Sequence, residues 1–496
     1  MPIPNKVLIA NRGEIAVRVI RACHEMGVST VAVYSDADRD ALHVRNAVEA
    51  VHIGKAPSSE SYLIGERILA AAKETGADAI HPGYGFLSEN AGFARAVQDA
   101  GLIWIGPSPE AIEAMGSKTE SRLRMEAAGV PVVPGTKQAL SSAEEAEGIA
   151  VQLGFPVMLK ASAGGGGKGM RQVDRVEDIG SALSAAKSEA LSSFGDDSVY
   201  IEKRIVGPRH VEVQVLADGH GNTLHLFERD CSVQRRNQKV VEETPCPVLG
   251  DETRQAMCDV AIKAAEAVDY VGAGTVEFLM GSDGSFYFLE MNTRLQVEHP
   301  ITEMVTGIDL VQAQIRIAGG EALEMKQEDI RQNGHAIECR IYAEDPANNW
   351  APSPGRIRGY REPGGPWVRV DSGVYAGAEV SLFYDPMVAK LVVWGVDRNE
   401  AIRRTQRALL EYRVRGIATN TAFFRQLLDD PDFVSGHYDT GFLTAERMDG
   451  WPADRDLSEV ATVAAAIAAF ERDTRMKRPQ QGSDASGGSA WRWSLR

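Results

Sequence analysis

Cysteine is scarce in this sequence of 496 residues, and its five cysteines are scattered, odd in number and never spaced as C-x-x-C. This pattern argues against a disulfide framework and against a zinc site, so we expect reduced thiols. Long apolar runs are also missing, because no stretch reaches the roughly 18 to 20 apolar residues that a membrane-spanning helix needs. The opening MPIPNKVLIANRGE lacks the basic and apolar regions of a signal peptide. We therefore expect a cytoplasmic protein that does not bind membranes.

Positive charge is in deficit, since 53 Lys and Arg face 69 Asp and Glu, which gives a formal net charge of −16. An acidic chain without a concentrated basic stripe repels a phosphate backbone, so we expect no nucleic-acid binding. Any anionic ligand must then be met by local Lys and Arg side chains. With 44% apolar residues over this length, the chain can fill three or four domains.

The N-terminal part alternates strand and helix patterns but has no dinucleotide fingerprint. Apolar strands are expected at 7–10, 30–34, 79–80 and 102–105, and amphipathic helices at 15–26, 64–73 and 91–99. This order predicts a doubly wound parallel domain over residues 1–115. The first turn reads NRGEIA, with only Gly13 where G-x-G-x-x-G would stand, which argues against an NAD site.

A glycine run, GGGGKGM at 164–170, follows an expected strand that ends at Lys160. Four successive glycines cannot form a helix or a strand core, so they form a loop. Its exposed backbone N–H groups and Lys168 could cradle phosphates, as a closing flap would, although a flexible linker is the alternative. It is not a P-loop, because G-x-x-x-x-G-K-[ST] is absent. An acidic, Ala-rich helix at 177–192 and a strand ending at 205 complete this smaller unit.

Antiparallel strands follow, and one hairpin carries a charge conflict. The runs TVEFLM at 275–280 and FYFLE at 286–290 flank Asp283–Gly284, a two-residue turn signal. Such a turn places Glu277 directly opposite Glu290, where like charges repel. A divalent cation such as Mg²⁺ would remove this cost. The alternative is a pair of solvated edge glutamates.

The segment EMNTRLQVEHP, which continues from that hairpin, shows polar residues at every second position. An extended strand would place them all on one side; they are Glu290, Asn292, Arg294, Gln296 and Glu298. We interpret this side as metal ligands at one end and an anion pocket with a carboxylate base at the other, the alternative being an exposed edge. Eight extended steps cover ~26 Å, so the segment must bend if both ends serve one reaction.

Other basic residues carry weaker signals. Lys118 and Lys160 are either surface lysines or phosphate ligands, and QRRNQK at 234–239 is either a solvated patch or an anion site. Residues 334–441 are typical of a separate α+β portion with a long helix at 398–413. An Ala-rich helix is expected at 457–470, and the polar tail 475–496 is expected to be disordered.

Seven motifs together resemble the biotin carboxylase family of the ATP-grasp superfamily, and the resemblance covers residues 4–443. They are IANRGEIAVRVIRA, HPGYGFLSEN, GGGGKGM, ERDCSVQRRNQKVVEE, FLEMNTRLQVEHPITE, ECRIYAEDP and YDPMVAKL. The resemblance implies an α/β and α+β multidomain fold. Its parts would be a doubly wound N-terminal domain (1–115), an ATP-grasp domain (116–334) with a mobile lid at about 131–205, a biotin carboxylase C-terminal domain (335–446), and a helix with a flexible tail (447–496).

The resemblance also implies roles for individual residues. Those assigned to ATP are Lys118, Lys160, Gly165, Gly166, Gly167, Lys168, Glu202, Lys203, Ile205, His210, Gln234 and Asn237. Those assigned to Mg²⁺ or Mn²⁺ are Glu277, Glu290 and Asn292. Those assigned to bicarbonate are Lys239, Arg294, Gln296 and Val297. Glu298 would be the general base, and Arg340 would face the ureido oxygen of biotin.

The implied activity is ATP- and bicarbonate-dependent carboxylation of biotin through carboxyphosphate, the first half-reaction of an acetyl-CoA or other acyl-CoA carboxylase, as in fatty acid biosynthesis. Implied partners are a biotin carboxyl carrier protein, a second copy of the chain and a carboxyltransferase subunit. Biotin must come from a carrier, since the chain has no A/V-M-K-M biotinylation signal. Alternatives are the biotin carboxylase part of a pyruvate-type carboxylase, another carboxyphosphate-forming ligase such as a carbamoyl-phosphate synthetase half, or an inactive scaffold. Asn237, which is His in many relatives, favours an acyl-CoA carboxylase system but does not identify the final acceptor.

Overall fold

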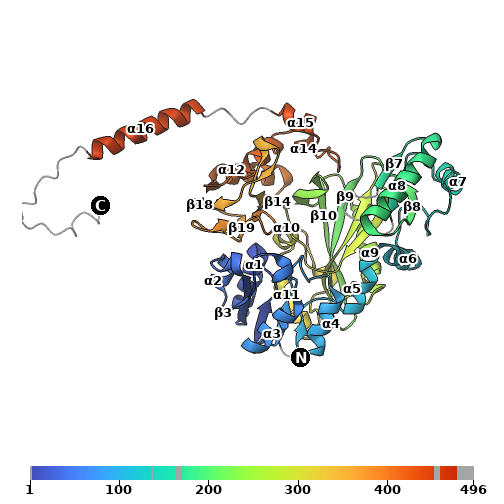
Figure 1. Ribbon diagram of the computed structural model, residues 1–496, viewed down its shortest axis with the longest axis horizontal. Coiled ribbons are helices and arrows are strands. Elements are labelled where there is room, and N and C mark those ends of the chain that lie inside the picture. Colours follow the sequence, from blue (N-terminus) through green and yellow to red (C-terminus); the bar gives the residue numbers. More distant parts are fainter. Residues whose placement is uncertain (1–2, 137, 162–169, 452–457, 477–496) are drawn as a thin grey trace, which may run out of the picture. The chain divides into compact units, whose positions relative to one another are not determined.

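The computed structural model describes residues 3–136, 138–161, 170–451 and 458–476 (Figure 1). The chain forms two units, Met1–Asp449 and Gly450–Arg496. Among the described residues no helix is long and apolar enough to cross a membrane. All five cysteines are buried and free, which confirms the expected absence of disulfides.

The N-terminal domain is a five-stranded parallel sheet flanked by helices, as its alternating pattern predicts. The strand order is β3-β2-β1-β4-β5. The strands are β1 (Lys6–Ile9), β2 (Ser29–Ser35), β3 (Glu49–Gly54), β4 (Ala79–His81) and β5 (Ile103–Trp104). The helices are α1 (Gly13–Glu25), α2 (Leu42–Asn46), α3 (Gly65–Thr75), α4 (Ala91–Asp99), α5 (Pro109–Gly116) and α6 (Lys118–Ala127). The order reverses between β1 and β4, the position at which such sheets open a crevice at the carboxyl ends of their strands.

A small antiparallel sheet with two covering helices forms the next part. Its strand order is β7-β6-β8. Its elements are α7 (Ala143–Leu153), β6 (Val157–Ala161), β7 (Met170–Val173), α8 (Ile179–Phe194) and β8 (Val199–Lys203). The core packs Val157, Leu159 and Ile201 of the sheet against alanines and leucines of the helices. Residues 162–169, which include most of the predicted glycine loop, lie outside the described residues.

The largest element is an eight-stranded antiparallel sheet with the order β13-β12-β9-β10-β11-β14-β21-β19. Its strands are β9 (Arg209–Ala217), β10 (Thr223–Arg235), β11 (Gln238–Thr244), β12 (Gly272–Met280), β13 (Phe286–Asn292), β14 (His335–Tyr342), β19 (Val368–Ser372) and β21 (Met387–Gly395). Because β14 pairs with β11, this sheet continues across the boundary expected at residue 334. The two predicted domains therefore share one sheet.

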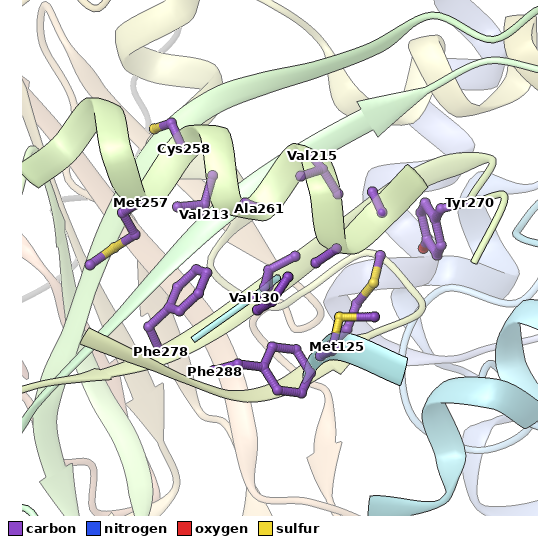
Figure 2. Close-up of a cluster of buried hydrophobic side chains, with 14 of the residues drawn as sticks. Met125, Val130, Val213, Val215, Met257, Cys258, Ala261, Tyr270, Phe278 and Phe288 are labelled. Atoms are coloured by element: carbon purple, nitrogen blue, oxygen red, sulfur yellow. The ribbon is translucent and has the colours of Figure 1, made fainter. Parts of the chain in front are cut away.

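Apolar side chains cover one face of this sheet. Figure 2 shows Met257, Cys258 and Ala261 of α9 (Asp251–Glu266) packed over Val213 and Phe278 of the strands. These residues are fully or almost fully buried. At ~25 cal/mol per Å² of apolar surface removed from water, such packing holds the strands that carry polar side chains on their other face.

The remaining elements surround the sheet and complete the C-terminal part. The helices are α10 (His299–Thr306), α11 (Leu310–Ala318), α12 (Arg398–Glu411), α13 (Thr421–Leu427), α14 (Pro431–Ser435) and α15 (Ala445–Gly450). The short strands are β15 (Glu344–Asp345), β16 (Ala351–Pro352), β17 (Gly355–Arg356), β18 (Gly359–Arg361), β20 (Glu379–Val380) and β22 (Arg413–Arg415). Helix α12 ends at Glu411, two residues before the predicted end at 413, because Arg413 is the first residue of β22. In the second unit, α16 (Ser458–Met476) confirms the predicted Ala-rich helix, while 477–496 lie outside the described residues.

Candidate active site

A cavity of about 690 Å³ lies between the small sheet, the large sheet and the segment that joins β13 to α10. It brings together most of the site residues predicted from the sequence. These are Lys160, Glu202, Lys203, Ile205, His210, Gln234, Asn237, Lys239, Glu277, Glu290, Asn292, Arg294, Gln296, Val297, Glu298 and Arg340. The predicted Gly165, Gly166, Gly167 and Lys168, and the side chain of Lys118, lie outside the described part of the chain.

The structure adds lining residues that the sequence reasoning missed. Most are apolar: Val133, Met158, Met170, Leu279 and Leu289. Arg204, Pro208, Gln238 and Thr440 complete the lining. Met158 could have been found from the strand pattern, because it stands two residues before Lys160 on β6 and therefore shares its side. The apolar walls suit a flat, uncharged ring system at this end of the cavity.

Three glutamates stand in a row across neighbouring strands of the large sheet. Glu277 on β12 is directly opposite Glu290 on β13, as predicted, and directly opposite Glu212 on β9. Glu212 is in turn opposite Arg229 on β10. Carboxylates in directly opposed positions repel one another. The row therefore requires cations on the cavity side.

Lys239 supplies one of these cations. Its ammonium lies 2.6 Å from Glu212, 2.8 Å from Glu277 and 2.7 Å from Glu298. Burial opposes the charge of Lys239, but the three carboxylates outweigh burial and raise the pKa of the ammonium well above its ordinary value. Burial likewise opposes ionisation of Glu277, yet Lys239 and His210 hold the pKa of this carboxyl well below its ordinary value. Lys239 and Glu277 are therefore both charged at neutral pH.

Two amides orient the Glu277 carboxylate. The side chains of Asn292 and Gln296 each donate to its Oε1, at 2.9 and 2.8 Å. The Asn292 oxygen accepts from Arg294 at 2.9 Å, and Arg294 also donates to Glu89. Glu277 and Glu290 thus present carboxylate oxygens on one cavity wall, and hard oxygens of this kind fit Mg²⁺ or Mn²⁺.

Arg229 is a fully buried organiser that the sequence reasoning did not single out. Its guanidinium donates to Glu212 at 2.7 Å, to Gln296 at 2.8 Å, and to three further side-chain oxygens. Those oxygens belong to Gln214, Thr275 and Thr302. Every nitrogen of the guanidinium has a partner, which is the condition for burying such a charge. The motif ERDCSVQRRNQK contains Arg229, but nothing in the sequence shows that it lies under the site.

Glu298 lies at the other end of the polar segment, within reach of two cations. It accepts from Lys239 and, at 3.0 Å, from Nη2 of Arg340. Burial would raise its pKa, but Lys239, Arg340 and Arg229 hold the pKa of this carboxyl well below its ordinary value. The segment bends after Asn292, where β13 ends, and α10 begins at His299. This bend brings both ends of the predicted polar side to one cavity.

The opposite end of the cavity carries Lys160 and Glu202. Lys160 on β6 forms an ion pair with Glu202 on β8, and Arg122 approaches the same carboxylate at 3.2 Å. The ammonium of Lys203 instead donates to the backbone oxygen of Gly154 at 2.8 Å, so it is held away from the other cations. This end offers basic groups beside the apolar walls. Gln234 and His210 lie at the glutamate row instead, because Gln234 is 3.1 Å from Nδ1 of His210, whose Nε2 is 3.0 Å from Glu277.

Asn237 occupies a backbone conformation that explains its residue type. Arg236 and Asn237 have φ values of 51° and 63° and form the tight turn between β10 and β11. A two-residue hairpin turn with both φ values positive is a type I′ turn, in which Asn is among the favoured residues. The turn places Lys239 at the start of β11.

A second cavity, of about 530 Å³, opens where the strand order of the parallel sheet reverses. Its walls include Asn11 and Tyr84, which follow β1 and β4. It shares Arg294, Val297 and Arg340 with the first cavity. Two binding spaces therefore meet at the same cationic residues.

Comparisons with known proteins agree with this architecture. Three family profiles match: "Biotin carboxylase, N-terminal domain" over residues 3–112, "Carbamoyl-phosphate synthase L chain, ATP binding domain" over 117–326, and "Biotin carboxylase C-terminal domain" over 338–445. The chain is 54% identical to a pyruvate carboxylase subunit of Methanothermobacter thermautotrophicus over 443 residues, covering 89% of this chain and 90% of that protein. It is 53% identical to the biotin carboxylase of Nostoc sp. over 439 residues, covering 88% and 98%.

A solved structure shows the same likeness. The biotin carboxylase domain dimer of Hydrogenobacter thermophilus 2-oxoglutarate carboxylase, in complex with MgADP, ADP and bicarbonate, is 48% identical. The match has a TM-score of 0.83 and covers 89% of this chain and 98% of that one. These findings confirm the resemblance drawn from the motifs. The chain belongs to the biotin carboxylase family of ATP-dependent ligases, within the ATP-grasp superfamily.

Proposed function

We propose that this chain uses ATP and bicarbonate to carboxylate biotin on a separate carrier protein, through carboxyphosphate. One observation carries the proposal: the Lys239 ammonium joins Glu277, on the glutamate row, to Glu298. Glu298 in turn pairs with Arg340, which lines both cavities. A single cation thereby links the place suited to a metal and phosphates with a carboxylate suited to take a proton.

The nucleotide would occupy the first cavity, with its base against Met158, Leu279 and Leu289 and its phosphates near Lys160. Lys118 and Lys168, whose side chains lie outside the described part of the chain, are the proposed further phosphate ligands. Glu277 and Glu290, with Asn292 beside them, are the proposed ligands of Mg²⁺ or Mn²⁺. Such an ion neutralises charge that develops on the phosphates during phosphoryl transfer.

Bicarbonate would bind among Lys239, Arg294 and the segment of Gln296 and Val297. Glu298 takes the bicarbonate O–H proton as the bicarbonate oxygen attacks the γ-phosphorus and ADP leaves, which gives carboxyphosphate. Bound anions share the charge of Lys239, and this sharing raises the basicity of Glu298. Carboxyphosphate then yields CO₂ and phosphate, and phosphate takes the N1′ proton of biotin as N1′ attacks CO₂.

Biotin would enter through the second cavity, because this cavity reaches Arg340 from the other side. The Arg340 guanidinium would stabilise the negative charge that develops on the ureido oxygen, as an oxyanion hole does. Lys390, which is fully buried, donates to the backbone oxygen of Val297 at 2.8 Å and fixes the wall between the two spaces. A biotinylated carrier domain is the proposed partner.

The wider setting is also part of the proposal. The chain would work in the cytoplasm as a homodimer with a carboxyltransferase subunit, in an acetyl-CoA or other acyl-CoA carboxylase. The dimeric relative supports the homodimer. The second candidate is the biotin carboxylase part of a pyruvate-type carboxylase, which the similarity to the Methanothermobacter protein favours. Carboxylation of each acceptor by the reconstituted complex would distinguish them.

The test is ADP release from Mg-ATP with and without bicarbonate and free biotin. We expect release to require bicarbonate and to increase with biotin. Release that is indifferent to both would overturn the proposal. Release that depends on bicarbonate and ammonia, but not on biotin, would favour a carbamoyl-phosphate type of ligase.

A further inference from the structure

A pair of buried carboxyls lies behind Arg340, outside the cavity lining. Glu242 on β11 is directly opposite Glu338 on β14, and both side chains are fully buried. Within the described part of the chain, both oxygens of Glu338 and the Oε2 atom of Glu242 lack a hydrogen-bond partner. Carboxyls this poorly solvated favour the neutral form.

Glu242 shares a cation with the candidate base. Its Oε1 atom accepts from Nε of Arg340 at 2.6 Å, while Nη2 of the same guanidinium lies 3.0 Å from Oε2 of Glu298. One arginine therefore divides its charge between a carboxylate behind the site and a carboxylate in the site. A change in the charge of Glu242 must alter how strongly Arg340 pairs with Glu298.

The charged and titratable groups that face Glu242 come from four chain segments. They are Arg340, Glu338, Cys339 and Tyr342 of β14, Glu298 before α10, Lys239 of β11 and Cys231 of β10. Burial raises the pKa of Glu242 to about 7, Arg340 and Lys239 oppose this rise, and Glu298 adds to it. A carboxyl with this pKa changes charge near neutral pH.

We propose that Glu242 is a positioning residue that holds the Arg340 guanidinium back from Glu298 and so preserves the basicity of that carboxylate. The inference deepens the proposed function and rests on it. When Glu242 is ionised, it competes for Arg340. When Glu242 is protonated, Arg340 pairs more fully with Glu298, the pKa of Glu298 falls further, and a weaker base takes the bicarbonate proton more slowly.

Turnover is highest with Glu242 ionised, above its pKa of about 7, and falls as pH drops through that value. Bicarbonate supply also changes with pH, so the measured quantity must be kcat at saturating bicarbonate and Mg-ATP. A variant without a titrating carboxyl at this position has no such transition.

The experiment compares kcat for bicarbonate-dependent ADP release from pH 5.5 to 9 in the wild type and in Glu242→Gln, Glu242→Asp and Glu338→Gln. We expect kcat of Glu242→Gln to be about 10-fold lower at pH 8, which corresponds to ~1.4 kcal/mol, with no transition near pH 7. Its KM for ATP should stay within about twofold of wild type, because the nucleotide end is untouched. Glu338→Gln removes an equally buried carboxyl from the opposed position and should keep the wild-type transition.

Glu242→Asp keeps the charge but shortens its reach, so we expect a transition that remains but is displaced, with a lower kcat. It carries the test if Glu242→Gln does not fold. A wild-type profile without a transition between pH 6 and 8, or an unchanged transition in Glu242→Gln or Glu242→Asp, would overturn the inference. If the wild type shows no bicarbonate-dependent turnover at any pH, the proposed function itself has failed.

Discussion

The two halves of the large sheet bury carboxylates in different ways. In the half formed by β13, β12, β9 and β10, which we call the open half, Glu290 and Glu277 line a cavity. Glu212 lies beside Glu277 in the same row, and Lys239 pairs with both. In the half formed by β11, β14, β21 and β19, which we call the closed half, the nearest cations to Glu242 and Glu338 belong to the protein itself. They are Arg340 and Lys239 for Glu242, and Lys390 and Arg340 for Glu338.

The closed half also joins parts of the chain that are far apart in sequence. Lys390 on β21 lies 3.3 Å from Glu14 of α1 and 4.0 Å from Asp371 of β19. Burial raises the pKa of Glu14, and Lys390 opposes this rise. Where protein cations fill the space, buried carboxylates tie domains together; where space remains, they can bind a ligand cation.

The largest effect is expected at Glu298, where the two halves meet. Glu298→Gln removes the proposed proton acceptor but keeps an oxygen that can accept from Lys239. Bicarbonate-dependent ADP release should fall by about 10²–10⁴-fold, the usual contribution of a general base. Titration calorimetry with Mg-ATP checks the variant, and its nucleotide affinity should be unchanged. Loss of nucleotide binding would contradict the assigned role.

Glu277→Gln tests the open half. Removing this charge would leave the proposed metal ion with one carboxylate fewer and leaves the Lys239 charge less well balanced. We expect turnover to fall by about 10²-fold or more, the scale on which loss of one group that stabilises developing charge acts. A higher Mg²⁺ requirement should accompany the loss. Asp283→Asn, at the exposed tip of the same hairpin, is the control and should leave both quantities within twofold.

Arg229→Met tests the layer beneath the open half. The change leaves the buried Glu212 without its closest guanidinium and Gln296 without a donor. Removing one partner of a buried ion pair costs about 3–5 kcal/mol in the free energy of unfolding. Urea denaturation measures this cost. The control is Arg124→Met, which breaks an exposed ion pair with Glu120 on α6 and should cost at most about 0.5 kcal/mol. Equal costs for the two variants would show that Arg229 stabilises the fold no more than an exposed arginine does.

Glu338→Gln gives the smallest expected effect and tests the closed half. Burial holds the pKa of Glu338 well above its ordinary value, whereas an unfolded glutamate titrates near 4.3. The folded wild type therefore keeps a proton that the unfolded chain loses, and this contribution to stability declines as pH rises above about 4.3. Gln has no such dependence. The stability of Glu338→Gln relative to wild type should increase with pH, and a constant difference would contradict a neutral Glu338.

The sequence predicted the paired glutamates correctly, but through a turn that the structure does not contain. The chain reverses over Ser282–Asp283–Gly284, with Gly281 N–H donating to Ser285 at 2.7 Å, so the pairs nearest the turn are offset by one residue. A bulge at Leu289 removes this offset and restores the predicted register at Glu290. Two opposite shifts cancel at Glu277. Bulges depend on how side chains pack across the ladder, which a turn signal does not report.

The fold was predictable where one period dominates. Four strands of the parallel sheet, three of its helices and the strands of the glutamate hairpin follow from apolar spacing. Strand β3 and helices α2, α5 and α6 were not predicted; β3 is only partly buried and lacks an apolar run. The continuation of the large sheet from β11 to β14 was not predictable, because it joins strands about 90 residues apart and depends on tertiary pairing. The alternation of polar residues from Glu290 to Glu298 correctly predicted that these side chains lie together. All five polar residues line the same cavity, although the chain bends between them.

The residues that support the site could not be found in the same way. Arg229 and Glu242 are charged residues in a strand, and exposed positions are their usual place. Their burial depends on partners from other strands, such as Gln296 for Arg229 and Arg340 for Glu242. Only the assembled sheet brings these partners together.

We propose that a metal ion arriving with the nucleotide offsets the opposed charges of Glu277 and Glu290, with Asn292 beside them. Crystals grown with Mn²⁺ and a non-hydrolysable ATP analogue would test it by anomalous scattering. We expect a peak at coordination distance, ~2.1 Å, from carboxylate oxygens of both Glu277 and Glu290. Bound nucleotide with no peak there, and with both side chains turned toward solvent, would contradict the account.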